Sequence, residues 1–260
     1  MNRRLTLPEQ ILRGFGVVEP GDIDLEAIAW EMGAKVKYRE LHGCEARIIG
    51  RGDKAIISVD IDAQPRRQRF SVAHELGHWR HHRGRCLICR AEDIGTGRQR
   101  SATDPERIAD EFASDLLLPR YMLDPMLRGV PRPTMKAVRS IAEAFDASLT
   151  ATLIKIIETN RYPMMIVCHA MHGGRKWFRA SASVPTRWFP RDELDHESSV
   201  FSLLYGAGAE EAFPRRVGAD AWFDRSEAAH YEVLEQAFAL PDQQVCAIIT
   251  FPDEKMLRER

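Results

Sequence analysis

The chain has 260 residues, 44% of them hydrophobic and 29% charged, with a formal net charge of −1 at pH 7. This composition is that of a globular protein with one large domain or two modest ones, and the near-neutral charge argues against a protein that coats nucleic acids. No apolar run reaches the length needed to cross a membrane, and no hydrophobic stretch follows the charged N-terminus as it would in a signal peptide.

The first elements are predicted to be two short helices followed by a small sheet. Residues 8–33 favour two helices broken at residues 14–21. The apolar stripe of the second helix consists of Leu25, Ile28, Ala29 and Met32. Residues 34–61 change period, because glycine-containing breaks separate three strand-like runs. These runs are residues 34–38, 46–49 and 55–59. We expect the sheet that they form to pack against the helix that follows.

The next helix, predicted from about residue 65 to residue 82, carries an H-E-x-x-H pattern at residues 74–78. Side chains four residues apart lie one above the other on a helix, so His74 and His78 can direct two imidazole nitrogens to a single Zn²⁺. Glu75 lies one step around the helix, within reach of a zinc-bound water rather than of the metal. The metal would lower the pKa of that water, and the carboxylate would take its proton.

The surroundings of this pattern favour a metal site over its alternative, a surface helix with two unrelated histidines. Pro65 suits a first helical turn. A buried flank is indicated by the apolar residues Phe70, Ala73, Leu76 and Trp79. His82 is four residues beyond His78, but three side chains in a line along a straight helix suit one metal poorly. We therefore expect His81 and His82 to face solvent or to support the ligands.

A further helix is predicted to begin at residues 103–106 with a capping residue, a proline and an acidic residue, and to end at Pro119. Its buried stripe consists of Ile108, Ala109, Phe112, Ala113, Leu116 and Leu117. A catalytic zinc needs a third protein ligand, and this helix offers Glu106, Asp110 and Glu111. Glu106 and Asp110 share one face, so we favour Glu106 as the ligand and Asp110 as the acceptor that orients a histidine ring. Asp110 and Glu111 remain alternative ligands, and a solvated helix face is the alternative to any such role.

Residues 134–160 are predicted to form two more helices. The inward face of the first consists of Val138, Ile141, Ala142 and Phe145. The joint at residues 146–147 is similar to a helix-turn-helix, but an ordinary helical hairpin is favoured because the segment lacks a basic recognition face. We place a domain boundary near residue 161 and expect a small α/β module after it. Its predicted elements are strands at residues 164–168, 177–180 and 245–251 and a helix at residues 198–206.

Two blocks of sequence, residues 69–78 and 106–119, together resemble the ImmA/IrrE family of metallo-endopeptidases, and the likeness extends over about residues 20–160. The resemblance implies an α+β fold. The domains that it implies are a zincin-like zinc metallopeptidase at residues 1–132, a helical, helix-turn-helix-like extension at 133–160 and a C-terminal α/β sensory, GAF-like module at 161–260.

The same resemblance implies a site and a substrate. The metal ligands that it implies are His74, His78 and Glu106. Glu75 would be the catalytic residue. The position of Asp110 is often Asn in the family, and either residue can orient a histidine ring. Such peptidases cut a helix-turn-helix transcriptional repressor and so release genes of DNA-damage responses, mobile elements or phage defence. The activators implied are single-stranded DNA or a small molecule.

The five cysteines concern both the site and the location of the protein. Cys86 and Cys89 lie in a loop at residues 84–101, and no second pair is spaced to complete a structural zinc site with them. A thiolate is a strong zinc ligand, so Cys89 could occupy the open position of the metal, as a cysteine at about this place does in some relatives. The alternative is a thiol with no such role. An odd number of cysteines without a secretory signal indicates a reducing cytoplasm.

Two other functions remain open. A degenerate peptidase fold could be a non-enzymatic regulator that binds a protein partner or DNA through residues 134–160. A zinc hydrolase could instead act on a substrate other than protein. The presence of Glu75 favours the endopeptidase over the regulator, because a pure binding module needs no general base.

Overall fold

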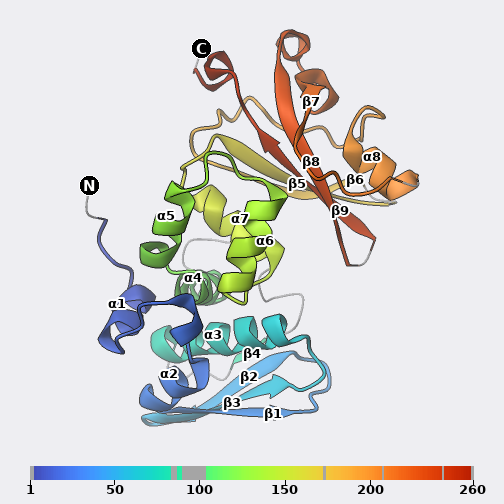
Figure 1. Cartoon of the computed structure of the whole chain (residues 1–260). Coiled ribbons are helices and arrows are strands. Elements are labelled where there is room, and N and C mark those ends of the chain that lie inside the picture. The colour runs from blue at the N-terminus through green and yellow to red at the C-terminus, as the bar shows by residue number, and fades with distance from the viewer. Residues whose placement is uncertain are drawn as a thin grey trace. The chain divides into compact units, whose positions relative to one another are not determined.

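The computed structural model describes residues 3–82, 87–89, 104–171, 174–206, 208–241 and 243–258, with the backbone alone at residues 87–89 (Figure 1). These residues form eight α-helices and two β-sheets, a mixed architecture that agrees with the predicted class. The chain divides into two compact units. The N-terminal unit comprises Met1–Arg128 and Ile141–Ser148, and the C-terminal unit comprises Gly129–Ser140 and Leu149–Arg260. The domain limits predicted at residues 132 and 160 stay predictions.

Of the helices described, none combines the length and the apolar character that a membrane crossing requires.

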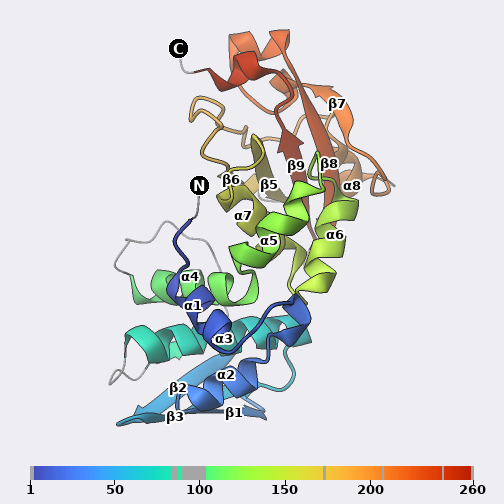
Figure 2. The same ribbon diagram turned by 60° about the vertical axis from the view of Figure 1, so that its left-hand side comes forward.

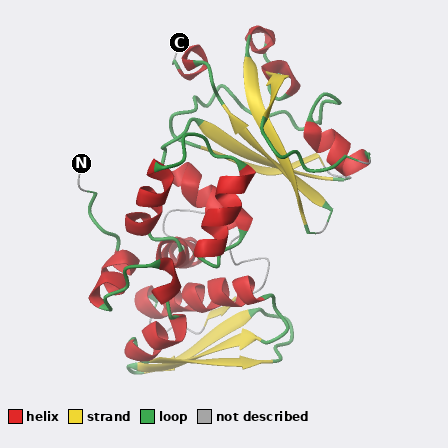
Figure 3. Ribbon diagram, in the orientation of Figure 1, coloured by secondary structure: helices red, strands yellow, loops and turns green. Residues whose placement is uncertain are grey.

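The N-terminal unit contains a four-stranded sheet and five helices before residue 129 in its described part (Figure 3). The helices are α1 (Leu7–Gly14), α2 (Leu25–Glu31), α3 (Pro65–His81), α4 (Pro105–Leu117) and α5 (Arg120–Arg128). The strands are β1 (Ala34–Arg39), β2 (Ala46–Arg51), β3 (Lys54–Asp60) and β4 (Leu87–Cys89). They lie in the order β1-β3-β2-β4, with β1 parallel to β3 and the other pairs antiparallel. The helices and strands predicted up to α4 are confirmed, whereas the sequence patterns did not indicate α5 or β4.

Helices α2 and α3 lie on one face of this sheet, and α3 lies between the sheet and α4 (Figures 1 and 2). Successive strand residues point to opposite faces, so β3 buries Ile57 and Val59 beneath the helices and leaves Ile56 exposed. The ring of Trp79 on α3 lies against Gly50 of β2, where a Cβ atom would collide with it. The indole Nε1–H also donates to the carbonyl oxygen of Met32 at 2.8 Å. These contacts fix the end of the motif helix on the sheet.

Helices α6 (Met135–Ala144) and α7 (Leu149–Glu158) confirm the predicted pair. The four apolar residues predicted for the inward face of α6 are all buried. At the joint, Asp146 has a φ of 47°, a left-handed conformation that a short polar side chain tolerates. Its carboxylate lies 3.2 Å from Nε of Arg66 and 3.4 Å from Nε of Arg69, both on α3. The joint is therefore attached to the start of the motif helix within the N-terminal unit.

The C-terminal unit contains a five-stranded antiparallel sheet in the order β6-β5-β9-β8-β7. Its elements are β5 (Met164–Ala170), β6 (Gly174–Ala180), α8 (Ser199–Tyr205), β7 (Arg215–Gly218), β8 (Glu232–Leu240) and β9 (Gln244–Thr250). The three strands and the helix predicted after residue 161 are confirmed, whereas β7 and β8 were not indicated by sequence. Helix α7 packs on β5 and β6.

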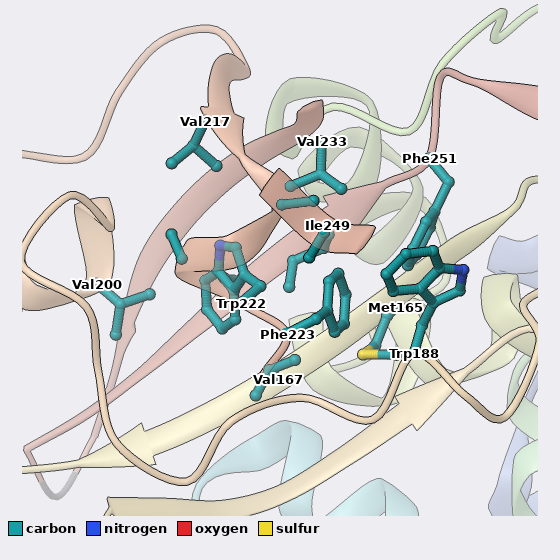
Figure 4. Close-up of a cluster of buried hydrophobic side chains, with 14 of the residues drawn as sticks. Met165, Val167, Trp188, Val200, Val217, Trp222, Phe223, Val233, Ile249 and Phe251 are labelled. Atoms are coloured by element: carbon teal, nitrogen blue, oxygen red, sulfur yellow. The ribbon is translucent and has the colours of Figure 1, made fainter. Parts of the chain in front are cut away.

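A hydrophobic cluster holds this unit together (Figure 4). It joins apolar residues of the strands to aromatic rings from the connecting segments. The residues labelled in Figure 4 are Met165, Val167, Trp188, Val200, Val217, Trp222, Phe223, Val233, Ile249 and Phe251. A buried carboxylate, that of Glu235 on β8, accepts hydrogen bonds from the indole of Trp222 at 3.0 Å and from the backbone N–H of Ser199 at 2.6 Å. These bonds satisfy both buried carboxyl oxygens.

Candidate metal centre

The motif helix α3 is buried along the whole of residues 71–79. The side chains of His74 and Glu75 have no exposed surface, and His78 has 1%. Of the predicted apolar flank, Ala73, Leu76 and Trp79 are buried, and Phe70 is half-buried. The polar residues of the motif therefore lie in the interior, where each requires a partner.

Gly77 sets the distance between α3 and α4. A Cβ atom at Gly77 would lie 2.9 Å from the Cα of Ala109 and 3.1 Å from its carbonyl oxygen. Only a residue without a side chain fits there, because these are backbone atoms of α4 that cannot rotate away. The close approach brings the two histidines of α3 within reach of the first turn of α4.

The first turn of α4 forms as its sequence predicts. Asp104 precedes the helix and accepts the backbone N–H of Glu106 at 3.0 Å, and Pro105 occupies the first helical position. Glu106 thus stands at the positive end of the helix dipole, which favours its carboxylate form. This local structure presents the carboxylate toward α3.

Three side chains predicted as metal ligands converge here. The Nε2 atoms of His74 and His78 lie 3.0 Å apart. The carboxylate of Glu106 lies 3.2 Å from Nε2 of His74 and 3.3 Å from Nε2 of His78. One donor atom from each residue lies within 4.8 Å of the other two, an arrangement that could hold a metal ion.

The second nitrogen of each imidazole has its own partner. Nδ1 of His74 lies 2.9 Å from Oδ1 of Asp110, and Nδ1 of His78 lies 3.3 Å from Nδ1 of His82. A carboxylate can only accept, so Asp110 keeps the proton of His74 on Nδ1 and leaves a lone pair on Nε2. This is the contact expected for Asp110, and His82 lies where a supporting residue would.

The acidic neighbours in the cluster favour the protonated, positively charged form of His74. Burial disfavours the charged form of His74, but hydrogen bonds with Asp110 and Glu106 outweigh it and raise the pKa of the imidazole to about 9. Burial likewise opposes the charge of Glu106, but hydrogen bonds with His74 and His78 hold its pKa well below the usual range. Two imidazoles and one carboxylate are also the donor set of many catalytic zinc sites, so the residues present fit that metal.

The other candidate residues are placed as follows. Glu75 is fully buried beside His74, whose pKa its carboxylate helps to raise. Glu111 lies on the exposed side of α4 in an ion pair with Arg107 at 2.8 Å, away from the cluster. The ring of His81 stands edge-on to Phe112, and burial lowers its pKa.

The side chains of the two loop cysteines lie outside what the structure describes. Cys86 lies outside the described residues, as does most of the predicted loop at 84–101. For Cys89 the backbone is described, and it pairs with Ala46 of β2 in the antiparallel register of β4.

Sequence reasoning did not identify the role of Gly77. A glycine inside a helix signals a close approach, but which helix approaches depends on the fold. His82 is four residues beyond His78 on the same helix face, and its contact with that ring is one of the two roles expected for it.

Comparison with known proteins gives two findings. Residues 26–156 match the Peptidase M78 family model, described as an IrrE N-terminal-like domain. A solved structure titled Mycobacterium tuberculosis transcriptional regulator has a similar fold, with a TM-score of 0.60 and 13% sequence identity. The similarity covers 94% of this chain and 86% of that one. No curated protein matches the sequence significantly.

Proposed function

The chain belongs to the Peptidase M78 family of IrrE N-terminal-like proteins, and from this premise we propose that it is a zinc-dependent endopeptidase. The observation that carries the proposal is the convergence of buried His74 and His78 with half-buried Glu106, beside the buried Glu75. A structural zinc site would be closed by four protein ligands, whereas three ligands leave a position for a reacting group.

In this proposal the zinc is held by Nε2 of His74, Nε2 of His78 and the carboxylate of Glu106. Bound there, Zn²⁺ supplies a Lewis acid that polarises a peptide carbonyl and makes water more acidic. Asp110 holds the proton of His74 on Nδ1, so that Nε2 stays a ligand. Glu75 takes a proton from the attacking water and delivers it to the amine nitrogen that leaves.

We propose a helix-turn-helix transcriptional repressor as the substrate, so that cleavage derepresses damage-response, mobile-element or phage-defence genes. Family membership supports this choice, and so does the fold shared with a protein titled as a transcriptional regulator. The alternative is a regulator without catalysis, which would bind a protein partner or DNA.

For the C-terminal unit we propose a sensory, GAF-like role, with single-stranded DNA or a small molecule as the activating signal. Its five-stranded antiparallel sheet with α7 packed on β5 and β6 supports a module of this kind. A signal can raise activity only if it binds the active state better than the resting state.

We further propose that Cys89 is an inhibitory zinc ligand in the resting protein. The motivation is its place in the chain between α3 and α4, the two helices that carry the three proposed ligands. Cys89→Ser should raise cleavage without activator, because serine is a much poorer zinc ligand, and Cys86→Ser should change it little. Equal basal rates in wild type and Cys89→Ser, at matched zinc content, would exclude the inhibitory role.

The decisive experiment for the catalytic proposal is Glu75→Gln. It keeps the shape of the side chain and removes the base, so we expect normal zinc content and a loss of cleavage of about 10²-fold or more. The substrate in this assay is a purified helix-turn-helix repressor, chosen by examining the genes next to the one for this chain, and products are identified by mass spectrometry. Glu111→Gln, on the exposed side of α4, is the matched control. Wild-type protein that loads zinc and binds the repressor without cutting it would support the regulator instead.

A further inference from the structure

Two cysteines outside the metal centre face each other across the sheet of the C-terminal unit. Cys168 on β5 and Cys246 on β9 are directly opposite in the antiparallel register. Both are free thiols, and neither has any exposed surface. Two small apolar side chains could occupy these positions simply to fill the core, so the geometry of the pair has to decide whether they can react with each other.

The hydrogen-bond pattern shows which kind of site the pair occupies. Antiparallel strands alternate between hydrogen-bonded pairs, which exchange N–H···O bonds, and non-hydrogen-bonded pairs, whose side chains lie closer. The N–H of Phe251 donates to the carbonyl oxygen of Pro163 at 3.0 Å, which makes Pro163 and Phe251 a hydrogen-bonded pair. Cys168 is five residues after Pro163, and Cys246 is five residues before Phe251 (168 − 163 = 251 − 246). Since five is odd, the cysteines form a non-hydrogen-bonded pair.

This kind of site brings two cysteines into the range of a disulfide. The Cα atoms of a non-hydrogen-bonded pair are about 4.5 Å apart, and a disulfide spans Cα distances of about 4.4–6.8 Å. Closure therefore needs little backbone movement. At the neighbouring hydrogen-bonded positions, by contrast, the side chains diverge more.

The two thiols are also chemically different. The hydrogen bond with Cys246 lowers the pKa of Cys168, although burial opposes this, and the charge of Lys176 adds to the lowering. The same hydrogen bond and burial raise the pKa of Cys246. The S–H of Cys168 can also donate to Oε1 of Gln244 at 3.4 Å. Cys168 is thus the better nucleophile, and Cys246 keeps its proton.

The pair lies near the ends of its strands, where local opening would let a small reagent reach it. Strand β5 ends two residues after Cys168, at Ala170, and β9 begins two residues before Cys246, at Gln244. Gln244 itself is only half-buried. Strand ends open more readily than strand centres, so brief openings here would expose the thiols.

We propose that Cys168 and Cys246 form a two-electron redox site that closes to a cross-strand disulfide with a peroxide as the oxidant. The Cys168 thiolate attacks one oxygen of hydrogen peroxide, the O–O bond breaks, and the products are a Cys168 sulfenic acid and, after protonation, water. The Cys246 sulfur, losing its proton, then attacks the Cys168 sulfur. The S–O bond breaks, a second water leaves, and the S–S bond forms. Two thiols are oxidised and one peroxide is reduced to two waters.

The disulfide would cross-link β5 to β9. The presence of an oxidant would thereby change the covalent structure of the C-terminal unit, for which a sensory role is proposed. It closes a long loop of the chain, which restricts the unfolded state, so the oxidised protein should unfold at a higher temperature. Dithiothreitol should reverse this shift.

The test is peptide mapping of the full-length protein after treatment with hydrogen peroxide, blocking of free thiols with N-ethylmaleimide and non-reducing digestion with trypsin. Trypsin places Cys168 in the peptide 162–175, Cys246 in 226–255 and Cys44 in 40–47, while Cys86 and Cys89 share the peptide 86–90. We expect a linked species of 162–175 with 226–255, two hydrogen masses lighter than the sum of the peptides. Cys168→Ser should abolish it, and Cys44→Ser should not.

The mapping of wild-type protein keeps the test valid even if Cys168→Ser folds poorly. The proposal is overturned if peptides 162–175 and 226–255 carry maleimide after peroxide treatment and unfolding. It is also overturned if Cys168 ends as sulfinic acid without the linked species, because an opposed and reactive Cys246 would have intercepted the sulfenic acid.

Discussion

At the scale of single residues, the proton on His74 decides how the centre competes for metal. Asp110 and Glu106 raise the pKa of His74 to about 9, so zinc must displace a proton below that pH. Zinc affinity should therefore climb about tenfold per pH unit and level off near pH 9. The folding stability of the metal-free protein should change with pH in the opposite direction to the zinc affinity. The stability that protonated His74 contributes is fully present below its unfolded pKa of about 6.5 and is lost as pH rises through about 9.

Asp110→Ala tests the source of this proton affinity. Removing the acceptor should weaken zinc binding by about 10- to 100-fold at neutral pH, and the plateau of affinity should move to lower pH. Asp110→Asn keeps an acceptor oxygen and should lose less. The measurement is competition for zinc with a fluorescent chelator between pH 6 and about 9.5. An unchanged plateau in Asp110→Ala would show that Asp110 does not control the proton on His74.

At the scale of elements, the centre depends on how closely α3 and α4 approach each other. Alanine in a helix interior is ordinarily about 1 kcal/mol more favourable than glycine. At Gly77 the added methyl meets the backbone of Ala109 at 2.9 Å, and overpacking of this kind costs roughly 1–3 kcal/mol. Gly77→Ala should therefore lower the melting temperature and weaken zinc binding, because the histidines move away from Glu106.

Gly14 provides the matched control, since it ends α1 and a Cβ atom there meets nothing within 4 Å. Gly14→Ala should leave both the melting temperature and the zinc affinity nearly unchanged. Thermal unfolding with and without zinc measures both quantities. If Gly77→Ala were as stable as Gly14→Ala, close packing at Gly77 would not position the site.

Sequence patterns could predict the helices of this centre because the relevant signals are local. The four-residue spacing of His74 and His78 and the cap, proline and glutamate at the start of α4 need no knowledge of the rest of the fold. The choice among Glu106, Asp110 and Glu111 was only partly predictable. All three are acidic, and their distances from α3 follow from the crossing of two helices.

Elements that escaped prediction depend on distant partners. Strand β8 contains Glu235 and Gln236, which break the apolar pattern but are buried. The carboxylate of Glu235 is satisfied by Trp222 and the start of α8, and Gln236 accepts the backbone N–H of Met135 at 2.9 Å. Helix α5 contains Pro125, which argues against a helix when only the sequence is considered. Strand β4 is three residues long and is recognisable only by its pairing with β2.

At the scale of the whole molecule, removal of the C-terminal sheet should damage more than the sensory part. Helix α7 belongs to the C-terminal unit and buries Leu153, Ile156 and Ile157. Full burial of each such side chain stabilises the folded state by roughly 1.5–3 kcal/mol. A fragment of residues 1–160 would keep α7 but lack the strands on which it packs, so we expect it to aggregate and to melt below the full chain.

Size-exclusion chromatography and thermal unfolding of this fragment, with zinc content measured in parallel, check the expectation. The full-length chain at the same concentration is the reference. A monodisperse 1–160 fragment with full zinc and an unchanged melting temperature would show that α7 is stable without the sheet.

The path of the chain between its units bears on how such a protein can be rebuilt by recombination. The chain leaves the N-terminal unit after Arg128, returns at Ile141 and leaves again after Ser148, so α6 is shared between the two. A sensory domain joined at one junction could be exchanged as a cassette. In this chain, a recombination event at any one position between residues 128 and 149 would leave a segment without the unit on which it packs. We therefore expect the N-terminal and C-terminal units to be inherited together and to vary together, rather than to be exchanged independently.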